Sequence, residues 1–217
     1  MHILIINIIL ISIIFYLIGS IPNAYLLTRS RNIDITKAGS GNVGALNSYE
    51  VTKSKTIGIL VLLLDLLKGF LPAFILTALF KVPLNLALLP LIMLIAGHNF
   101  SIWLKFKGGR GLATAAGICI AVNFWLMIFW AVLFLICFAI KRNVHIGNVV
   151  ATILLPLTII FTSDFLIKYN YDYSNSPELI NYHSAALFTL IASISILILI
   201  KHIKPMVELI KKSKNKN

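Results

Sequence analysis

Six long apolar runs, separated by polar segments, decide what this chain can fold into. They cover residues 3–19, 56–80, 82–96, 112–140, 148–167 and 185–200. A helix needs roughly 20 mainly apolar residues to cross the hydrocarbon core of a bilayer. With 59% hydrophobic and 12% charged residues, the chain is far more apolar than an average globular domain, which has about 45–50% apolar and about 25% charged residues. The sequence therefore predicts an all-α polytopic membrane protein.

The run at residues 112–140 is long for a single span, and the positions of the basic residues indicate how it is divided. In one continuous helix, Lys141 and Arg142 would lie across the membrane from the basic residues at 105–110. A turn near Asn123 keeps them on one side, as the excess of Lys and Arg in cytoplasmic loops requires. The short fourth segment is then shielded from lipid by its neighbours. We expect about seven transmembrane segments, with the N-terminus outside and the C-terminus cytoplasmic.

The segments between these runs suggest one membrane domain over residues 1–217. Residues 3–19 are expected to form an uncleaved first helix, because no Lys or Arg precedes them and no good cleavage site follows. A polar loop is expected at residues 168–184 and a basic cytoplasmic tail at 201–217. The net charge of +12 is explained by the positions of the basic residues around the spans, so no nucleic-acid partner is expected.

The first polar loop contains a glycine-rich stretch, Gly-Ser-Gly-Asn-Val-Gly, at residues 39–44. Its spacing matches the dinucleotide fingerprint G-x-G-x-x-G, but that fingerprint requires a preceding strand in a βαβ unit, and none is expected here. Closely spaced glycines also let backbone N–H groups approach a phosphate, and a hydroxyl such as that of Ser40 adds a donor. The stretch is therefore either an anion cradle or a flexible turn beside the membrane.

A second glycine-rich loop has the sequence Lys-Gly-Gly-Arg-Gly at residues 107–111 and directly precedes an apolar run. Its two cations flank a backbone without side chains, and a helix that begins after it would present its N-terminus to an anion. The alternative is an ordinary basic loop on the cytoplasmic side. Two such cradles on one face suggest two phosphorylated ligands or one large one.

Several ionisable residues lie within or at the ends of the runs. Asp65 and Lys68 are three residues apart, hence on one face of a helix, and form either a structural ion pair or part of a substrate site. His98, His145 and His202 are expected at the cytoplasmic face, as phosphate donors, bases or ordinary interfacial residues. No metal cluster or nucleophile triad is recognisable, so an enzyme of this kind would act on an activated substrate without a cofactor.

The motifs together resemble the bacterial acyl-phosphate:glycerol-3-phosphate acyltransferases, the PlsY family. The resemblance is carried in order by residues 19–22 (Gly-Ser-Ile-Pro), 34–47, 64–69 (Leu-Asp-Leu-Leu-Lys-Gly), 97–100 (Gly-His-Asn-Phe) and 105–114. It implies a seven-span enzyme of phospholipid biosynthesis in the cytoplasmic membrane. Its substrates would be a fatty acyl phosphate and glycerol 3-phosphate, its products lysophosphatidate and phosphate, and a homodimer is possible.

The resemblance also implies which residues form the site. Ser40, Lys107 and His202 are expected to be catalytic. The residues expected to bind or orient the substrates are Gly39, Gly41, Asn42, Gly44, Asn47, Asp65, Lys68, His98, Gly108, Gly109, Arg110, Gly111 and His145.

The chain departs from the family pattern at three positions. Glu50 stands where the family usually has Arg, His145 where it usually has Ser, and Pro205 where it usually has Asn. These changes leave open a divergent active enzyme, an enzyme with altered substrates, or a catalytically silent paralogue. A non-enzymatic anion transporter is less favoured, because transporters commonly show paired repeats and none is visible here.

Overall fold

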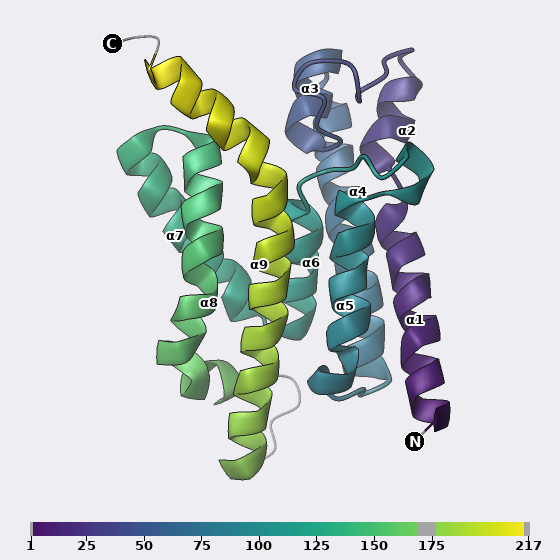
Figure 1. Cartoon of the computed structure of the whole chain (residues 1–217), viewed down its shortest axis with the longest axis vertical. Helices are drawn as coiled ribbons and strands as arrows, with labels where there is room; N and C mark the ends of the chain where they lie inside the picture. The colour runs from purple at the N-terminus through teal and green to yellow at the C-terminus, as the bar shows by residue number, and fades with distance from the viewer. Residues whose placement is uncertain (1, 169–176, 215–217) are drawn as a thin grey trace. The chain divides into compact units, whose positions relative to one another are not determined.

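A computed structural model describes residues 2–168 and 177–214, in which every regular element is a helix (Figure 1). In chain order these are α1 (His2–Ser20), α2 (Asn23–Arg29), α3 (Ala45–Thr52), α4 (Lys55–Phe74) with a π-helical extension (Ile75–Leu79), α5 (Leu84–Asn99), a 3₁₀ turn (Ile102–Leu104), α6 (Leu112–Val122), α7 (Phe124–Lys141), α8 (Val144–Lys168) and α9 (Pro177–Lys214). Among these residues, six helical segments are long and apolar enough to cross a membrane, and α6 is a shorter apolar helix. The prediction of about seven membrane segments, one of them short, is confirmed.

The break expected near Asn123 lies between α6 and α7. Asn123 is extended, with φ −161° and ψ 109°, and its side-chain Oδ1 accepts a hydrogen bond from the Trp125 amide at 3.1 Å. Its Nδ2 donates to the Leu166 carbonyl at 2.7 Å. Asparagine is a favoured residue at the start of a helix because its side chain satisfies an amide there. The chain also divides at this point into two compact units, Met1–Val122 and Asn123–Asn217.

In the first unit, α1 packs on α5 and α4 packs on α6. Both contacts are close because glycine replaces a larger side chain where the helices meet. A Cβ at Gly97 would collide with the Tyr16 carbonyl, and a Cβ at Gly69 would collide with the Thr114 carbonyl. Small residues of this kind allow membrane helices to approach closely. The packing fixes the ends of α1, α4 and α5, from which the polar loops emerge.

The polar segment at residues 20–55 is more ordered than a loop, because it contains α2 and α3. It packs against the start of α4 around an apolar core of Ala24, Ile35, Val43, Ile57 and Val61. Leu104, from the loop between α5 and α6, packs against this core. Figure 1 shows α2, α3 and that loop at the same end of the first unit, opposite the N-terminus. Both glycine-rich loops are therefore held at one end of the helices.

The second unit consists of α7, α8 and α9, with α8 packed against both other helices. Two expectations need correction here. Helix α9 begins at Pro177, within the loop expected at residues 168–184, and continues to Lys214 through most of the expected tail. Residues 169–176 of that loop and 215–217 of that tail lie outside the described residues. The tail is helical because Lys, Leu, Met and Glu are strong helix formers and continue the membrane helix without a cap.

Candidate functional site

The first glycine-rich loop is organised around the side chain of Asn47, which is 1% exposed. Its Oδ1 accepts from the Ser40 amide at 2.9 Å, and its Nδ2 donates to the carbonyls of Ala38 at 3.1 Å and Asn42 at 2.9 Å. The family resemblance implies that Asn47 orients a substrate. In the structure its side-chain amide is engaged by the loop backbone, so Asn47 fixes the shape of the loop.

Two glycines are required by the conformation of this loop. Gly39 and Gly41 have φ values of 58° and 70°, in the left-handed region that other residues rarely adopt. A Cβ at Gly39 would also collide with Oδ1 of Asn47. Gly44 is different: it is extended, with φ −164°, and directly precedes α3 without a side-chain cap. Helix α3 therefore begins without a side-chain cap on its first amides, and an uncapped helix N-terminus is a favourable place for an anion.

A carboxylate that precedes this loop in the same segment, Asp34, is also held by local hydrogen bonds. Its Oδ1 accepts from the hydroxyl of Thr36 at 2.7 Å and from the Thr36 amide at 3.1 Å. The side-chain hydrogen bond from Thr36 is the main cause that lowers the pKa of Asp34, with smaller contributions from Lys37 and Arg29. Asp34 thus stays ionised and fixes the turn that leads into the glycine-rich loop.

The second glycine-rich loop packs tightly on the C-terminal end of α5. The Gly109 amide donates to the His98 carbonyl at 3.1 Å. A Cβ at Gly108 would collide with the same carbonyl, and a Cβ at Gly109 would collide with Nε2 of His98. Gly111 has φ 84° and lies against Oδ1 of Asn99. These glycines are therefore required by close packing as well as by access to an anion.

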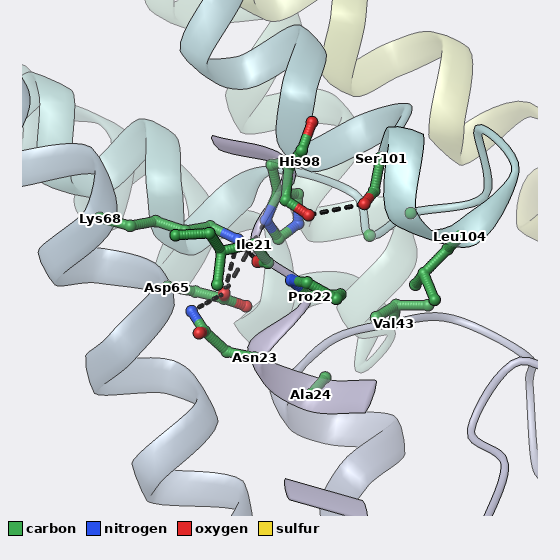
Figure 2. A pocket seen from close by; sticks show the side chains of 13 residues that line it. Ile21, Pro22, Asn23, Ala24, Val43, Asp65, Lys68, His98, Ser101 and Leu104 are labelled. Carbon is green, nitrogen blue, oxygen red and sulfur yellow. Dashed lines mark hydrogen bonds and ion pairs between the residues drawn. The ribbon is translucent and has the colours of Figure 1, made fainter. Parts of the chain in front are cut away.

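The two glycine-rich loops meet in one pocket. A Cβ at Gly109 would lie 2.5 Å from the carbonyl oxygen of Val43, so the two loops are in backbone contact. The pocket lies entirely within the first unit (Figure 2). Its lining residues are Ser20, Ile21, Pro22, Asn23, Ala24, Val43, Asp65, Lys68, His98, Ser101, Leu104, Gly108 and Gly109. Five motifs that are separate in the sequence thus share one cavity.

A buried ion pair forms the floor of this pocket. Nζ of Lys68 lies 3.0 Å from Oδ1 of Asp65, and both side chains are almost fully buried. Figure 2 shows Asp65 between Lys68 and Asn23, whose Nδ2 donates to the same Oδ1 at 3.0 Å. Lys68 also donates to the Ile21 carbonyl at 2.9 Å. The pair therefore ties α4 to the junction of α1 and α2. This contact agrees with the structural ion pair, one of the two alternatives that the sequence leaves open for Asp65 and Lys68.

His98 links this ion pair to the second glycine-rich loop. Its Nδ1 lies 3.9 Å from Oδ1 of Asp65 and 3.2 Å from the hydroxyl of Thr114 on α6. The opposite ring nitrogen, Nε2, lies against Gly109. The ring is thus buried between a carboxylate and the loop backbone. His98 is placed to position the loop more directly than to contact a substrate.

Some polar residues of the site were missed in the sequence. Asn23 and Ser101 line the pocket, and the Ser101 hydroxyl donates to the Ser20 carbonyl at 2.6 Å (Figure 2). The Tyr16 hydroxyl donates to the Phe100 carbonyl at 2.8 Å and joins the same ends of α1 and α5. Their place in the sequence could have indicated them, because these polar side chains lie near Pro22 and His98 at the ends of apolar runs. The Ser20 hydroxyl is buried at the pocket without a hydrogen-bond partner among the described residues.

The remaining predicted residues are distributed over both units. Ser40 and Lys107 are exposed, and Asn42 and Arg110 are half-buried, all on the two loops of the first unit. His145 and His202 belong to the second unit, so their approach to the glycine-rich loops stays a prediction.

The two histidines of the second unit have distinct local environments. His145 lies in the first turn of α8, where Oδ1 of Asn143 accepts from its amide at 2.9 Å. His202 is 1% exposed, and its Nδ1 lies 2.9 Å from the Ile198 carbonyl. Since a carbonyl only accepts, Nδ1 carries the proton of the neutral ring and Nε2 carries the lone pair. His202 therefore has the tautomer of a base at Nε2.

The fold and the pocket define a multi-pass membrane protein whose glycine-rich, basic loops are suited to phosphorylated ligands. The family model described as glycerol-3-phosphate acyltransferase matches residues 9–212, so the chain belongs to this family. The chain is 35% identical to the glycerol-3-phosphate acyltransferase of Endomicrobium trichonymphae, over 94% of this chain and 92% of that protein. It is 32% identical to the protein of the same name from Ehrlichia canis (strain Jake), over 93% and 94% of the two chains.

Solved structures agree with this assignment. The chain is similar to the crystal structure of PlsY, an integral membrane glycerol 3-phosphate acyltransferase, in its glycerol 3-phosphate form, with 28% identity and a TM-score of 0.76 over 95% of this chain and 93% of that one. The lysophosphatidic acid form gives 29% identity and a TM-score of 0.75 over the same shares. The resemblance to the PlsY family drawn from the motifs is confirmed.

Proposed function

We propose that this member of the glycerol-3-phosphate acyltransferase family transfers the acyl group of a fatty acyl phosphate to the first hydroxyl of glycerol 3-phosphate. The products are lysophosphatidate and inorganic phosphate, and the reaction serves phospholipid biosynthesis. The observation that carries the proposal is the meeting of two glycine-rich loops at one polar pocket, with Gly109 against the Val43 carbonyl. The relatives' names and the two ligand forms of PlsY support the acceptor and the product.

The reaction needs positioning more than a protein nucleophile. An acyl phosphate is a mixed anhydride: the glycerol hydroxyl oxygen bonds to the carbonyl carbon, and the bond from that carbon to the phosphate oxygen breaks. The hydroxyl proton passes to a phosphate oxygen of the substrates. Holding both phosphates near the hydroxyl makes the attack effectively unimolecular, and fixed N–H groups stabilise the developing negative charge.

The two loops would divide the phosphates between them. Ser40 and the glycine-rich segment at residues 39–44 would form one anion cradle, and Lys107, Arg110 and the glycine-rich segment at 108–111 would form the other. The amides of Ser40 and Gly109 are not among the donors to a ligand, because they are hydrogen-bonded within the protein. Lys107 is exposed on the second loop, so its charge could reach a ligand without a large loss of its own hydration. Asp65, Lys68 and His98 hold the helices and the second loop in place rather than react.

The glycine-rich loops and the C-terminus would face the cytoplasm, with the N-terminus outside and the protein in the cytoplasmic membrane. The basic residues of the first unit support this orientation. The end of this unit that holds the glycine-rich loops carries eight basic residues: Arg29, Arg31, Lys37, Lys53, Lys55, Lys105, Lys107 and Arg110. The turn between α4 and α5, at the other end, carries Lys81. Such an excess marks the cytoplasmic side. The possible homodimer also stays a prediction, which crosslinking in native membranes would test.

The three departures from the family pattern define the alternative. Glu50 is exposed on α3, near the first cradle in sequence, and reverses the charge of the usual Arg. His145 occupies the first turn of α8, and Pro205 lies inside α9, where it cannot donate a hydrogen bond. A substrate-altered or silent paralogue would retain both cradles but lack turnover with the proposed pair. An anion transporter is the less favoured alternative.

The deciding experiment measures lysophosphatidate formed by the purified, detergent-solubilised protein from palmitoyl phosphate and glycerol 3-phosphate. We expect product from the parent and nearly as much from Lys212→Ala. In Lys107→Ala, we expect turnover to be lost. Equal product from Lys107→Ala would contradict the cradle assignment. Product from palmitoyl coenzyme A but none from palmitoyl phosphate would contradict the donor. No product from a folded preparation that binds either substrate would indicate the altered or silent paralogue.

A further inference from the structure

An exposed apolar stripe runs along α9 and continues beyond its membrane-spanning part. Its members are Ile196, Ile200, Ile203, Val207 and Ile210, each between 43% and 60% exposed. They are spaced four, three, four and three residues apart, so they lie on one face of the helix. Lipid accounts for exposure at the first two positions, which precede Lys201. The last three positions need another explanation.

Helix α9 is too long to remain within the bilayer core. Its 38 residues span about 57 Å at 1.5 Å per residue, compared with a hydrocarbon thickness of about 30 Å. Residues 184–200 carry no charge, and Lys201 begins a segment with five of the helix's lysines. Pro205 lies inside the helix just after this point, and Figure 1 shows the yellow end of α9 inclined away from its green part. Proline is a common cause of such a change in helix direction.

Two exposed lysines of this segment, Lys204 and Lys211, lie along one side of the apolar stripe. Lys204, Lys211 and Lys212 are exposed, and so is Lys214 at the end of the helix. At about 100° per residue, Lys204 and Lys211 lie beside Ile203 and Ile210, and Lys212 lies on the opposite side of the helix. Glu208 is the one acidic residue between Lys201 and Lys214. Lysines beside an apolar stripe are typical of helices that lie in the membrane interface, because their long stems let the charge reach water.

We propose that Lys201–Lys214 lies along the surface of the bilayer and binds anionic lipid headgroups. The apolar stripe at Ile203, Val207 and Ile210 enters the boundary between headgroups and acyl chains. Lys204 and Lys211, beside the stripe, contact the negative headgroups, and the remaining lysines add to the attraction between a basic segment and an anionic membrane surface. A second copy of α9 fits the stripe less well, because two parallel copies would bring Lys204 and Lys211 close to like charges. The inference does not depend on the acyl-transfer reaction.

The test places a nitroxide spin label on the full chain in a background without native thiols, Cys119→Ala with Cys137→Ala. Single labels are attached at Ile210→Cys on the stripe, at Glu208→Cys off the stripe, and at Ile196→Cys within the span. Each protein is placed in phosphatidylcholine nanodiscs with and without phosphatidylglycerol. Collision of the label with oxygen, which prefers lipid, is compared with collision with a water-soluble nickel chelate. The label at 196 should report lipid in every sample and so confirms that the protein is folded and inserted.

With phosphatidylglycerol present, we expect lipid-like access at position 210 and water-like access at 208. The triple variant Lys204→Gln, Lys211→Gln and Lys212→Gln should lower the ratio of oxygen to nickel access at 210 severalfold while leaving position 196 unchanged. Water-like access at 210 in both lipid compositions would overturn the proposal. If the ratio of oxygen to nickel access at position 210 changed neither with phosphatidylglycerol nor in the triple lysine variant, the role of headgroup charge would be overturned. Spin–spin broadening at 210 that disappears on dilution with unlabelled chain would show a second copy on the stripe instead.

Discussion

The imidazole of His98 occupies the space that a side chain at position 109 would need. The Val43 carbonyl closes the same space from the first glycine-rich loop. The contact between His98 and Gly109 is therefore where the polar cluster on α4 and α5 meets both cradles. It determines how closely the second loop approaches its neighbours.

Gly109→Ala should destabilise the protein, because the added methyl group must displace a buried ring or a backbone carbonyl. Overpacking of this kind costs about 1–3 kcal/mol. Gly44→Ala is the matched control: its φ of −164° suits any residue, and the new Cβ meets only the Asn42 side-chain amide, at 3.0 Å. Thermal unfolding in detergent should show a clearly larger decrease in midpoint for Gly109→Ala. Equal decreases would contradict the packing described for the second loop.

Asn47→Ala should disorder the first cradle. The substitution removes the acceptor of the Ser40 amide and the donor to the carbonyls of Ala38 and Asn42. Each buried group left without a partner costs about 1–3 kcal/mol. Hydrogen exchange should become faster across residues 38–42, and turnover should fall with it. Asn47→Asp should be as damaging, because a carboxylate cannot donate to either carbonyl. Unchanged exchange in both variants would show that the loop is held by other contacts.

Removal of one partner of the Asp65–Lys68 pair should be more harmful than removal of both. Asp65→Asn or Lys68→Gln leaves a buried charge without its counter-ion, which typically costs about 3–5 kcal/mol. The double variant Asp65→Asn with Lys68→Gln removes both charges and should lose less than the sum of the single losses. A double-mutant cycle on the free energy of unfolding measures the difference. Strict additivity would mean that the 3.0 Å contact contributes no coupling.

Asp34 should make the first loop sensitive to acid. The Thr36 hydrogen bond lowers the pKa of this carboxyl in the folded protein, so folding favours its ionised form. The resulting stability is fully present above the unfolded pKa of about 3.9 and is lost as the pH falls through the lower folded value. Thr36→Val should reduce this acid-dependent loss in thermal midpoint, with little change near neutral pH. A parent and variant with identical acid profiles would exclude the role of this hydrogen bond.

The sequence predicted features that have strong local causes. The break at Asn123 was predicted from the positions of Lys141 and Arg142. The two glycine-rich loops were predicted from their closely spaced glycines. Helices α2 and α3 were missed because they are short and depend on packing around Ile35 and Val43, which are far apart from Leu104 in sequence.

Contacts between distant segments set the limit of prediction at the site. The pairing of Asp65 with Lys68 is visible as a three-residue spacing. The contacts of Asp65 with Asn23, and of His98 with Gly109, join segments more than ten residues apart and depend on how the helices cross. The end of α9 was predicted as a tail because its lysines suggested solvent, although the same residues are compatible with a continuous helix.

The amide of Asn47 has a consequence for the thermodynamics of ligand binding. Asn47 already fixes the backbone of the first cradle. The conformational entropy of that loop is therefore lost during folding, and ligand binding does not have to order the loop. A cradle ordered in advance binds more tightly for the same contacts. Anion binding at this loop should therefore carry only a small unfavourable entropy from chain ordering, and the rate of capture should be governed by encounter rather than by loop closure.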